Sequence, residues 1–440
     1  MKKPLQFYLI TDLHYFENAL GAEGEAYEAR SLTDQKCIAE TGAIIDSAFA
    51  RIAADTQTDM VLIAGDMTFN GEAESHKSVI KKLEALKKSG KKIFMITGNH
   101  DDDDEPYAFS GGERIIVEGT TREALTDLYY EYGIKDAIAF SREHLCYVAQ
   151  LGDGVRMLGV NYNVGPGNSV PEESMDWIVR RIEEAKSSGD LIFGMIHVPV
   201  LPGSPILALA GDAVVRDWER IAARLADAGM PLLFTGHMHM QSVNRLVTPA
   251  GNFIFDICTG SLVGGPCSIR KVLIDENWAM RVTTSTVADF DWDKKGMTAD
   301  EYFIWRFNRK IEGEIFSALR KHRVIAGIVR RSSLLPFGIE IVRNIFYGDQ
   351  PYTKETPEYA RVMKLLRLLR PFVWIAEKKL SRRSELFRDI PALAASLIGK
   401  EQKIDYNAVI DLKNGSVEEW KQRRPAHRPY PACIVRAKGL

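Results

Sequence analysis

The sequence has few cysteines and no long apolar run. Its five cysteines are scattered and odd in number, and no two form a CxxC pair, which argues against a disulfide framework and against a cysteine-based structural zinc site. No stretch approaches the roughly 18 to 20 apolar residues that a membrane-spanning helix needs. The apolar run Leu5–Ile10 leads directly into Asp12 and His14, so we expect a first strand rather than a secretory segment. We therefore expect a cytoplasmic protein without a transmembrane helix.

Charge is nearly balanced over the whole chain but unevenly distributed. The net charge is −2, whereas residues 301–440 hold 28 Lys and Arg against 15 Asp and Glu. At 440 residues the chain is too long for one ordinary core. We predict a catalytic domain over residues 1–292 and a basic, mainly helical domain over residues 293–440, with charges that attract the two parts to each other.

The first 290 residues alternate short β-rich runs with helical patterns, which is typical of an α/β fold. The predicted strands are Leu5–Ile10, Met60–Ala64, Lys92–Thr97, Val155–Val160, Leu191–Ile196, Pro231–Thr235, Phe253–Ile257, Ile269–Ile274 and Ala279–Thr284. The predicted helices are Glu40–Ala54, Ser75–Lys88, Glu172–Ser187 and Val214–Ala228. From about Thr298 the pattern becomes helical and basic.

Five short motifs follow apolar strands in this α/β region. They are Asp12-Leu13-His14, Gly65-Asp66, Gly98-Asn99-His100-Asp101, His197, and Gly236-His237-Met238-His239. Ligands of α/β sheets gather at the carboxyl ends of the strands, so these side chains should converge. Carboxylates, an amide oxygen and imidazoles form a mixed oxygen and nitrogen donor set. Such a set suits two divalent transition ions, Mn, Fe or Zn, better than calcium or magnesium alone.

In this order the motifs resemble those of the calcineurin-like metallophosphoesterases. The resemblance covers roughly residues 5–285 and implies a four-layer αββα sandwich, with a helical C-terminal domain attached. It also implies two ion sites that share Asp66. The first would use Asp12, His14, Asp66 and His239, and the second Asp66, Asn99, His197 and His237. His100 would face the substrate as general acid, with Asp101 orienting its imidazole, and a hydroxide between the metals would be the nucleophile.

Three differences from the motifs of related families narrow the resemblance to one branch of the superfamily. The segment Gly65–Gly71 lacks the Asp-Arg pair of protein Ser/Thr phosphatases, position 69 is Phe where purple acid phosphatases have a metal-binding Tyr, and no His follows as in the repair nucleases. The chain is most similar to the cyclic-nucleotide phosphodiesterase branch, including Gly159-Val160-Asn161, Gly165, Gly167 and Met175–Ile178. Asn161 stands where that branch has Asp. Tyr162 and Asn163 either line the pocket or form a strand-end turn.

Two other segments leave alternatives open. The acidic run Asp102–Glu105 is either a solvated loop or part of the site, where it would disfavour doubly charged monoesters. The basic C-terminal region, with an amphipathic helix over Arg361–Arg370, could dock on the acidic catalytic domain, contact an anionic membrane or nucleic acid, or mediate oligomerisation. Docking is favoured because of the charge asymmetry, and a nucleic-acid motif is lacking.

The sequence thus predicts a metal-dependent phosphodiester hydrolase acting on cyclic nucleotides or a similar small diester. The alternatives are a phosphomonoesterase or 5′-nucleotidase-like hydrolase on the same site, a non-catalytic scaffold, and a nuclease. All seven predicted ligands and His100 are present, which disfavours the scaffold.

Overall fold

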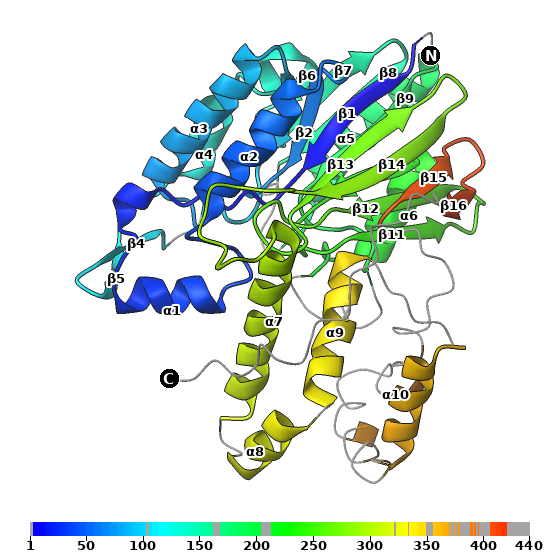
Figure 1. Cartoon of the computed structure of the whole chain (residues 1–440). Helices are drawn as coiled ribbons and strands as arrows, with labels where there is room; N and C mark the ends of the chain where they lie inside the picture. The colour runs from blue at the N-terminus through cyan, green and yellow to red at the C-terminus, as the bar shows by residue number, and fades with distance from the viewer. Residues whose placement is uncertain are drawn as a thin grey trace.

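Two β-sheets pack face to face, and helices cover the outer face of each (Figure 1). The computed structural model describes residues 3–102, 105–161, 168–203, 213–320, 323–332, 334–348, 355–368 and 405–419, with single residues and pairs between 370 and 395. Among these residues, no helix is both long and apolar enough to cross a membrane. The predicted four-layer αββα sandwich, followed by a helical C-terminal region, is confirmed.

The first sheet has the strand order β16-β15-β14-β13-β1-β2-β3. Its strands are β1 (Leu5–Ile10), β2 (Met60–Ala64), β3 (Lys92–Ile96), β13 (Ser268–Ile274), β14 (Ala279–Thr286), β15 (Ala408–Asp411) and β16 (Val417–Glu419). Strands β1, β2 and β3 are parallel neighbours, whereas β13 runs antiparallel to β1. The carboxyl ends of β1, β2 and β3 therefore lie at one edge of the sheet.

The second sheet has the order β11-β12-β10-β9-β8-β7-β6. Its strands are β6 (Ala137–Ser141), β7 (Cys146–Gly152), β8 (Val155–Val160), β9 (Leu191–Ile196), β10 (Leu232–Thr235), β11 (Ser242–Val247) and β12 (Phe253–Cys258). Parallel pairing joins β8 to β9, β9 to β10, and β10 to β12. This sheet also collects the carboxyl ends of its parallel strands at one edge.

Residue alternation in β1 explains why the fold has four layers. Successive side chains of a strand point to opposite faces, and in β1 both faces are apolar. Leu5, Phe7 and Leu9 join the core between the sheets, while Tyr8 and Ile10 join the core under the outer helices. A strand buried on both sides needs a partner layer on each, and the second sheet and the helices supply them.

The helices bury apolar faces at helical spacing. Helices α2 (Thr41–Ala54), α3 (Ala73–Lys88) and α4 (Arg122–Leu128) pack against the first sheet, and α5 (Glu172–Ser187) and α6 (Trp218–Ala228) against the second. In α5, Met175, Ile178 and Ile182 recur every three or four residues and are all buried. The predicted bounds of α5 match the structure, and α2 begins one residue later than predicted.

Two inserted segments fold together beside the sandwich. They carry η1 (Asn18–Leu20) and α1 (Glu25–Thr33) in the first, and β4 (Tyr107–Ser110) and β5 (Glu113–Ile116) in the second. Their aromatic side chains share a small core with Phe69, which is 1% exposed. A further turn, η2 (Ile134–Asp136), precedes β6. The insertions are therefore anchored next to the end of β2.

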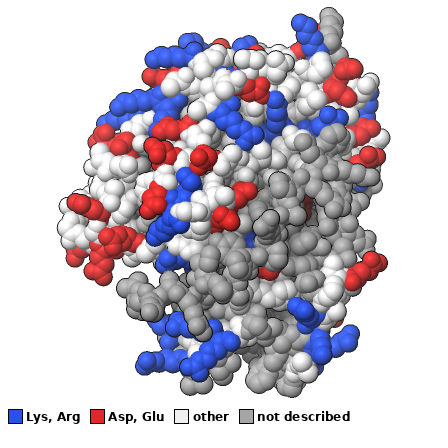
Figure 2. Space-filling view, in the orientation of Figure 1, with Lys and Arg blue, Asp and Glu red and all other residues white. Residues whose placement is uncertain are grey.

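The C-terminal region begins as a helical extension and returns to the first sheet. Helices α7 (Ala299–Ala318) and α9 (Leu334–Tyr347) lie side by side and extend away from the sandwich, with α8 (Arg323–Arg331) at their far end and α10 (Pro357–Leu368) to the right of α9 in this view (Figure 1). Exposed arginines gather at this end (Figure 2), namely Arg320, Arg323, Arg330 and Arg331. Strand β15 then pairs antiparallel with β14, so the chain beyond residue 292 also contributes strands to the catalytic sandwich.

Candidate metal centre

The predicted ligands come from the facing edges of the two sheets. Asp12 and His14 follow β1, Asp66 follows β2, and Asn99 follows β3. His197 follows β9, while His237 and His239 follow β10. All five predicted motifs therefore stand directly after parallel strands, as the sequence indicated.

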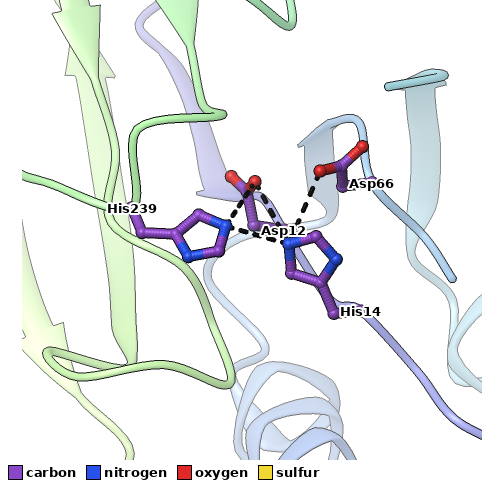
Figure 3. Close-up of side chains that lie close together, drawn as sticks. All are labelled: Asp12, His14, Asp66 and His239. Carbon is purple, nitrogen blue, oxygen red and sulfur yellow. Dashed lines mark hydrogen bonds and ion pairs between the residues drawn. The ribbon is translucent and has the colours of Figure 1, made fainter. Parts of the chain in front are cut away.

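The predicted first ligand set forms a compact buried cluster (Figure 3). One ligand atom each of Asp12, His14, Asp66 and His239 lies within 4.8 Å of the others. His239 Nε2 is 3.1 Å from Asp12 Oδ1, and His14 Nε2 is 3.5 Å from Asp66 Oδ2. The Nε2 atoms of His14 and His239 are only 2.9 Å apart. Two imidazole nitrogens and two carboxylates thus point at one spot.

The predicted second set also approaches Asp66. His197 Nε2 is 3.2 Å from Asp66 Oδ2, the same oxygen that faces His14. His237 Nδ1 lies 2.9 Å from Asn99 Oδ1, and the rings of His197 and His237 are 5.4 Å apart between centroids. Asp66 Oδ2 therefore lies next to a histidine of each predicted set.

The backbone of the ligand loops adopts unusual conformations. Asp12, His14, Asp66, His237 and His239 all have positive φ, between 40° and 65°. This left-handed region is uncommon for residues other than glycine and costs free energy, so the surrounding fold has to impose it. The backbone of five of the seven predicted ligands is therefore set by the fold around it.

Two motif glycines allow the loops to approach each other. A Cβ at Gly98 would lie 2.1 Å from Asp66 Oδ1, and one at Gly236 would lie 2.2 Å from Thr11 Oγ1. Any larger residue would displace a ligand or its support. The glycine in each motif is therefore explained by close packing at the centre.

Electrostatics at the centre are dominated by buried charge. Burial alone would raise the pKa of the Asp66 carboxyl, but His197, His100 and His14 hold it well below its usual range. Burial would lower the pKa of His197, yet Asp66 and Asp12 raise it to about 9. Two buried carboxylates are therefore stabilised by positive charge nearby. Protons on the imidazoles provide this charge in the metal-free protein, and bound metal cations can take their place.

The donor set fits two divalent transition ions. The two facing imidazole nitrogens and the two buried carboxylates of the first set can all bind one cation. His197 Nδ1 lies 2.7 Å from the carbonyl oxygen of Ala64, and this contact fixes the ring so that Nε2 faces Asp66. Asn99 supplies a neutral oxygen, which completes a mixed set of the kind that Mn, Fe and Zn accept.

The surroundings of His100 differ from the prediction. We predicted that Asp101 orients the His100 imidazole. Asp101 instead accepts hydrogen bonds from the backbone N–H groups of Gly98, Met67 and Thr68, because its buried side chain turns toward the ligand loops. The ring nitrogens of His100 face other partners: Asn70 Oδ1 lies 3.2 Å from Nδ1, and Lys36 Nζ lies 3.1 Å from Nε2.

The contacts also indicate the protonation of this ring. An ammonium can only donate, so Nε2 accepts from Lys36 and Nδ1–H donates to Asn70. Burial, reinforced by the Lys36 charge, holds the pKa of His100 well below its usual range. His100 is neutral in this arrangement, and its role as proton donor remains a prediction.

Sequence reasoning missed several supporting residues. Thr11 donates a hydrogen bond to Asp12 Oδ2, and Asn161 Oδ1 accepts one from the N–H of Thr97 just before Gly98. Asp256 accepts bonds from the N–H groups of Val200 and Leu201 in the loop after His197. None of these has a distinctive motif, although Asn161 stood in a block that the sequence singled out. Tyr162, Asn163, Gly165, Gly167, Asp103 and Asp104 lie outside the described residues.

Comparison with known proteins agrees with this geometry. The family model of the calcineurin-like phosphoesterases matches residues 5–241, which include every predicted ligand. The chain belongs to the calcineurin-like phosphoesterases. This supports a metal-dependent phosphoesterase with two divalent ions.

Individual relatives are distant. Sphingomyelin phosphodiesterase 1 of Caenorhabditis elegans is 23% identical over 217 residues, a match that covers 44% of this chain and 36% of that protein. A dimetal phosphatase from Danio rerio overlaps with a TM-score of 0.46 at 12% identity, over 65% of this chain and 97% of that one. A purple acid phosphatase from yellow lupin gives a TM-score of 0.41 at 12% identity, over 68% and 53%.

Proposed function

We propose that this phosphoesterase hydrolyses small phosphodiesters, with cyclic nucleotides as the leading substrate class. The observation that carries the proposal is the position of Asp66, whose Oδ2 lies 3.5 Å from His14 Nε2 and 3.2 Å from His197 Nε2. A single carboxylate between two imidazole-containing sets is what a pair of ions sharing one ligand requires. Bound ions of this kind activate a water molecule and offset charge on the phosphate oxygens.

Each residue of the centre has its own proposed role. Asp12, His14, Asp66 and His239 would hold one ion, and Asn99, His197 and His237 would complete the other. Thr11 and the Ala64 carbonyl orient Asp12 and His197. His100 stands beside the ligands with its Nε2 toward Lys36, where the phosphate ester would bind. Its predicted role is to interact with the leaving oxygen.

One finding supports a diester: the matched relative from Caenorhabditis elegans is named a phosphodiesterase. Phe69, which stands where the purple acid phosphatase pattern has a metal-binding Tyr, is buried in an aromatic cluster and argues against a centre of that kind. A small diester is the proposed partner, and a reducing cytoplasm is the proposed location because Cys37, Cys146, Cys258 and Cys267 are unpaired.

The test compares turnover of bis(p-nitrophenyl) phosphate, p-nitrophenyl phosphate, and 3′,5′- and 2′,3′-cyclic nucleotides by Mn²⁺-loaded protein. We expect the diesters to be turned over with the higher kcat/KM. Asn99→Ala should lower diester turnover by about 100-fold or more, because it removes a ligand. The exposed Asn252→Ala, at the far end of the second sheet, is the matched control and should retain full activity. Predominant monoester turnover would overturn the diester assignment, and an active Asn99→Ala variant would overturn the site.

A further inference from the structure

Lys36 is a buried cation at the centre that none of the five motifs contains. It is 7% exposed, and its Nζ contacts Nε2 of His100 at 3.1 Å. Among the described residues this is the single polar partner of the ammonium, and no carboxylate oxygen lies within ion-pair distance of it. An ammonium has three N–H donors, and a buried charge with unused donors is costly. Two donors of Lys36 therefore remain for a ligand.

The fold holds Lys36 at this place from outside the metal motifs. The residue ends the first inserted segment, and its backbone forms a bridge with Gly264, while the N–H of Cys37 bonds to the carbonyl of Val263. Its Nζ lies over the ring of Phe69 at 5.1 Å from the centroid, a cation–π arrangement. The side chain is thus directed toward His100 by the insertion on one side and by Phe69 on the other.

The position of Lys36 determines which atom of a substrate it would meet. The Nζ atom of Lys36 contacts Nε2 of His100, and the His100 ring packs against the ring of His14 with 5.0 Å between centroids. A ligand oxygen that lies between the metal ligands and His100 would therefore come within reach of Nζ. In hydrolysis, a water oxygen forms a bond to phosphorus while the bond from phosphorus to the leaving oxygen breaks, and the leaving oxygen keeps the electron pair. That oxygen gains the negative charge that a cation stabilises.

We propose that Lys36 contacts the leaving oxygen of the phosphate ester and stabilises its developing charge. This inference rests on the proposed function and adds a catalytic residue to it. The neutral His100 accepts one N–H of Lys36 and so aims the other two at the substrate. The ligand class that this pair recognises is a phosphate ester whose leaving group is a basic oxygen.

The experiment uses two diesters of equal charge and different leaving groups, bis(p-nitrophenyl) phosphate and diphenyl phosphate. Diphenyl phosphate releases phenolate, which is more basic than nitrophenolate. Loss of a residue that stabilises the leaving oxygen should therefore lower kcat more for diphenyl phosphate. We expect Lys36→Met to lower kcat by about 100-fold for diphenyl phosphate and by no more than about tenfold for the nitrophenyl diester. Lys36→Arg, which retains the charge, should recover most of the lost turnover. An equal loss for both diesters, or no loss, would overturn the inference.

A matched control separates this effect from folding. Lys91 is also a buried lysine, 5% exposed, but its Nζ bonds to the carbonyl oxygens of Asp55 and Thr58 far from the centre. Lys91→Met should leave the ratio of the two turnover numbers unchanged even where it lowers the unfolding temperature. A change of the ratio in both variants would mean that loss of any buried lysine disturbs the site, and the inference would fail.

A binding measurement is independent of turnover. Inorganic phosphate has four oxygens, so one of them occupies the leaving position when phosphate sits at the centre. In calorimetric titrations of Mn²⁺-loaded protein, Lys36→Met should bind phosphate about tenfold more weakly than wild type. Unchanged affinity would contradict the inference. If wild type turned over no diester but phosphate binding still depended on Lys36, the proposed function would fail and the anion contact would stand.

Discussion

At the residue scale, the metal ligands could be predicted from the sequence alone, whereas the groups around His100 could not. The ligands stand in contiguous motifs such as Gly98-Asn99-His100, and the glycines directly before Asp66, Asn99 and His237 reflect close packing at the centre. Asn70 and Lys36 reach His100 only through tertiary packing, 30 and 64 residues away in sequence. A short motif carries the first kind of information. It carries none of the second, so Asn70 and Lys36 could not be predicted as the contacts of the His100 ring.

Asn70 provides a residue-scale prediction. Its Oδ1 accepts the Nδ1–H of His100 and so fixes the orientation of the ring. Asn70→Ala should lower kcat for a diester by about tenfold or more with little change in KM, because the ring loses its orienting partner while the ligands remain. Metal content should stay at the wild-type value and serves as the internal control. Unchanged kcat would show that Asn70 does not position His100.

At the element scale, most strands of the sandwich were predicted, whereas β6, β7, β11, β15 and β16 were missed. The bounds of β1, β2, β8 and β9 agree with the predictions. Strands β6 and β11 have exposed side chains at alternate positions, and β15 and β16 have only four and three residues. Such short or half-exposed segments give a weak periodic signal, and their pairing is decided by the neighbouring strand.

The loop after β9 gives a prediction on pH and stability. Asp256 lies in β12 and clamps this loop through Val200 and Leu201, and burial raises its pKa to about 6. An unfolded Asp titrates near 4, so the unfolded chain releases this proton first as the pH rises. The contribution of Asp256 to the free energy of unfolding is full below about pH 4 and falls by up to about 3 kcal/mol as the pH passes 6.

Urea unfolding at several values between pH 4 and 7 measures this effect. Asp256→Asn keeps the shape of the side chain and cannot titrate, so its free energy of unfolding should decline less than that of wild type over this range. Asp59→Asn, at an exposed position, is the control and should follow wild type. Parallel curves for wild type and Asp256→Asn would contradict the argument.

At the scale of the whole molecule, the centre joins the two sheets. Asp12, His14, Asp66 and Asn99 come from the first sheet, and His197, His237 and His239 from the second. The C-terminal chain supports the same sandwich, because Ala408 and Ile410 of β15 are fully buried in the core between the sheets. The helical extension from α7 to α10 could be predicted from composition. The return of the chain to β14 could not, because residues 396–404, which precede it, give no strand-like pattern.

The boundary predicted at residue 292 remains a prediction. Helix α7 starts just beyond it, and its Tyr302 and Phe303 pack into the core under the first sheet. Tyr302 also donates a hydrogen bond to Glu40, next to Arg306. Helix α7 therefore contacts the catalytic part of the chain through both apolar and polar side chains, and docking of the whole basic region on it remains a prediction.

The central claim is that this chain holds two metal ions at the junction of the sheets. The most direct test is the metal content of protein that has been incubated with Mn²⁺ and freed of excess ion, measured by plasma mass spectrometry against protein concentration. The account predicts two ions per chain in wild type and fewer in Asp66→Ala, because the shared carboxylate is lost. One ion or none in wild type, or two in the variant, would contradict it.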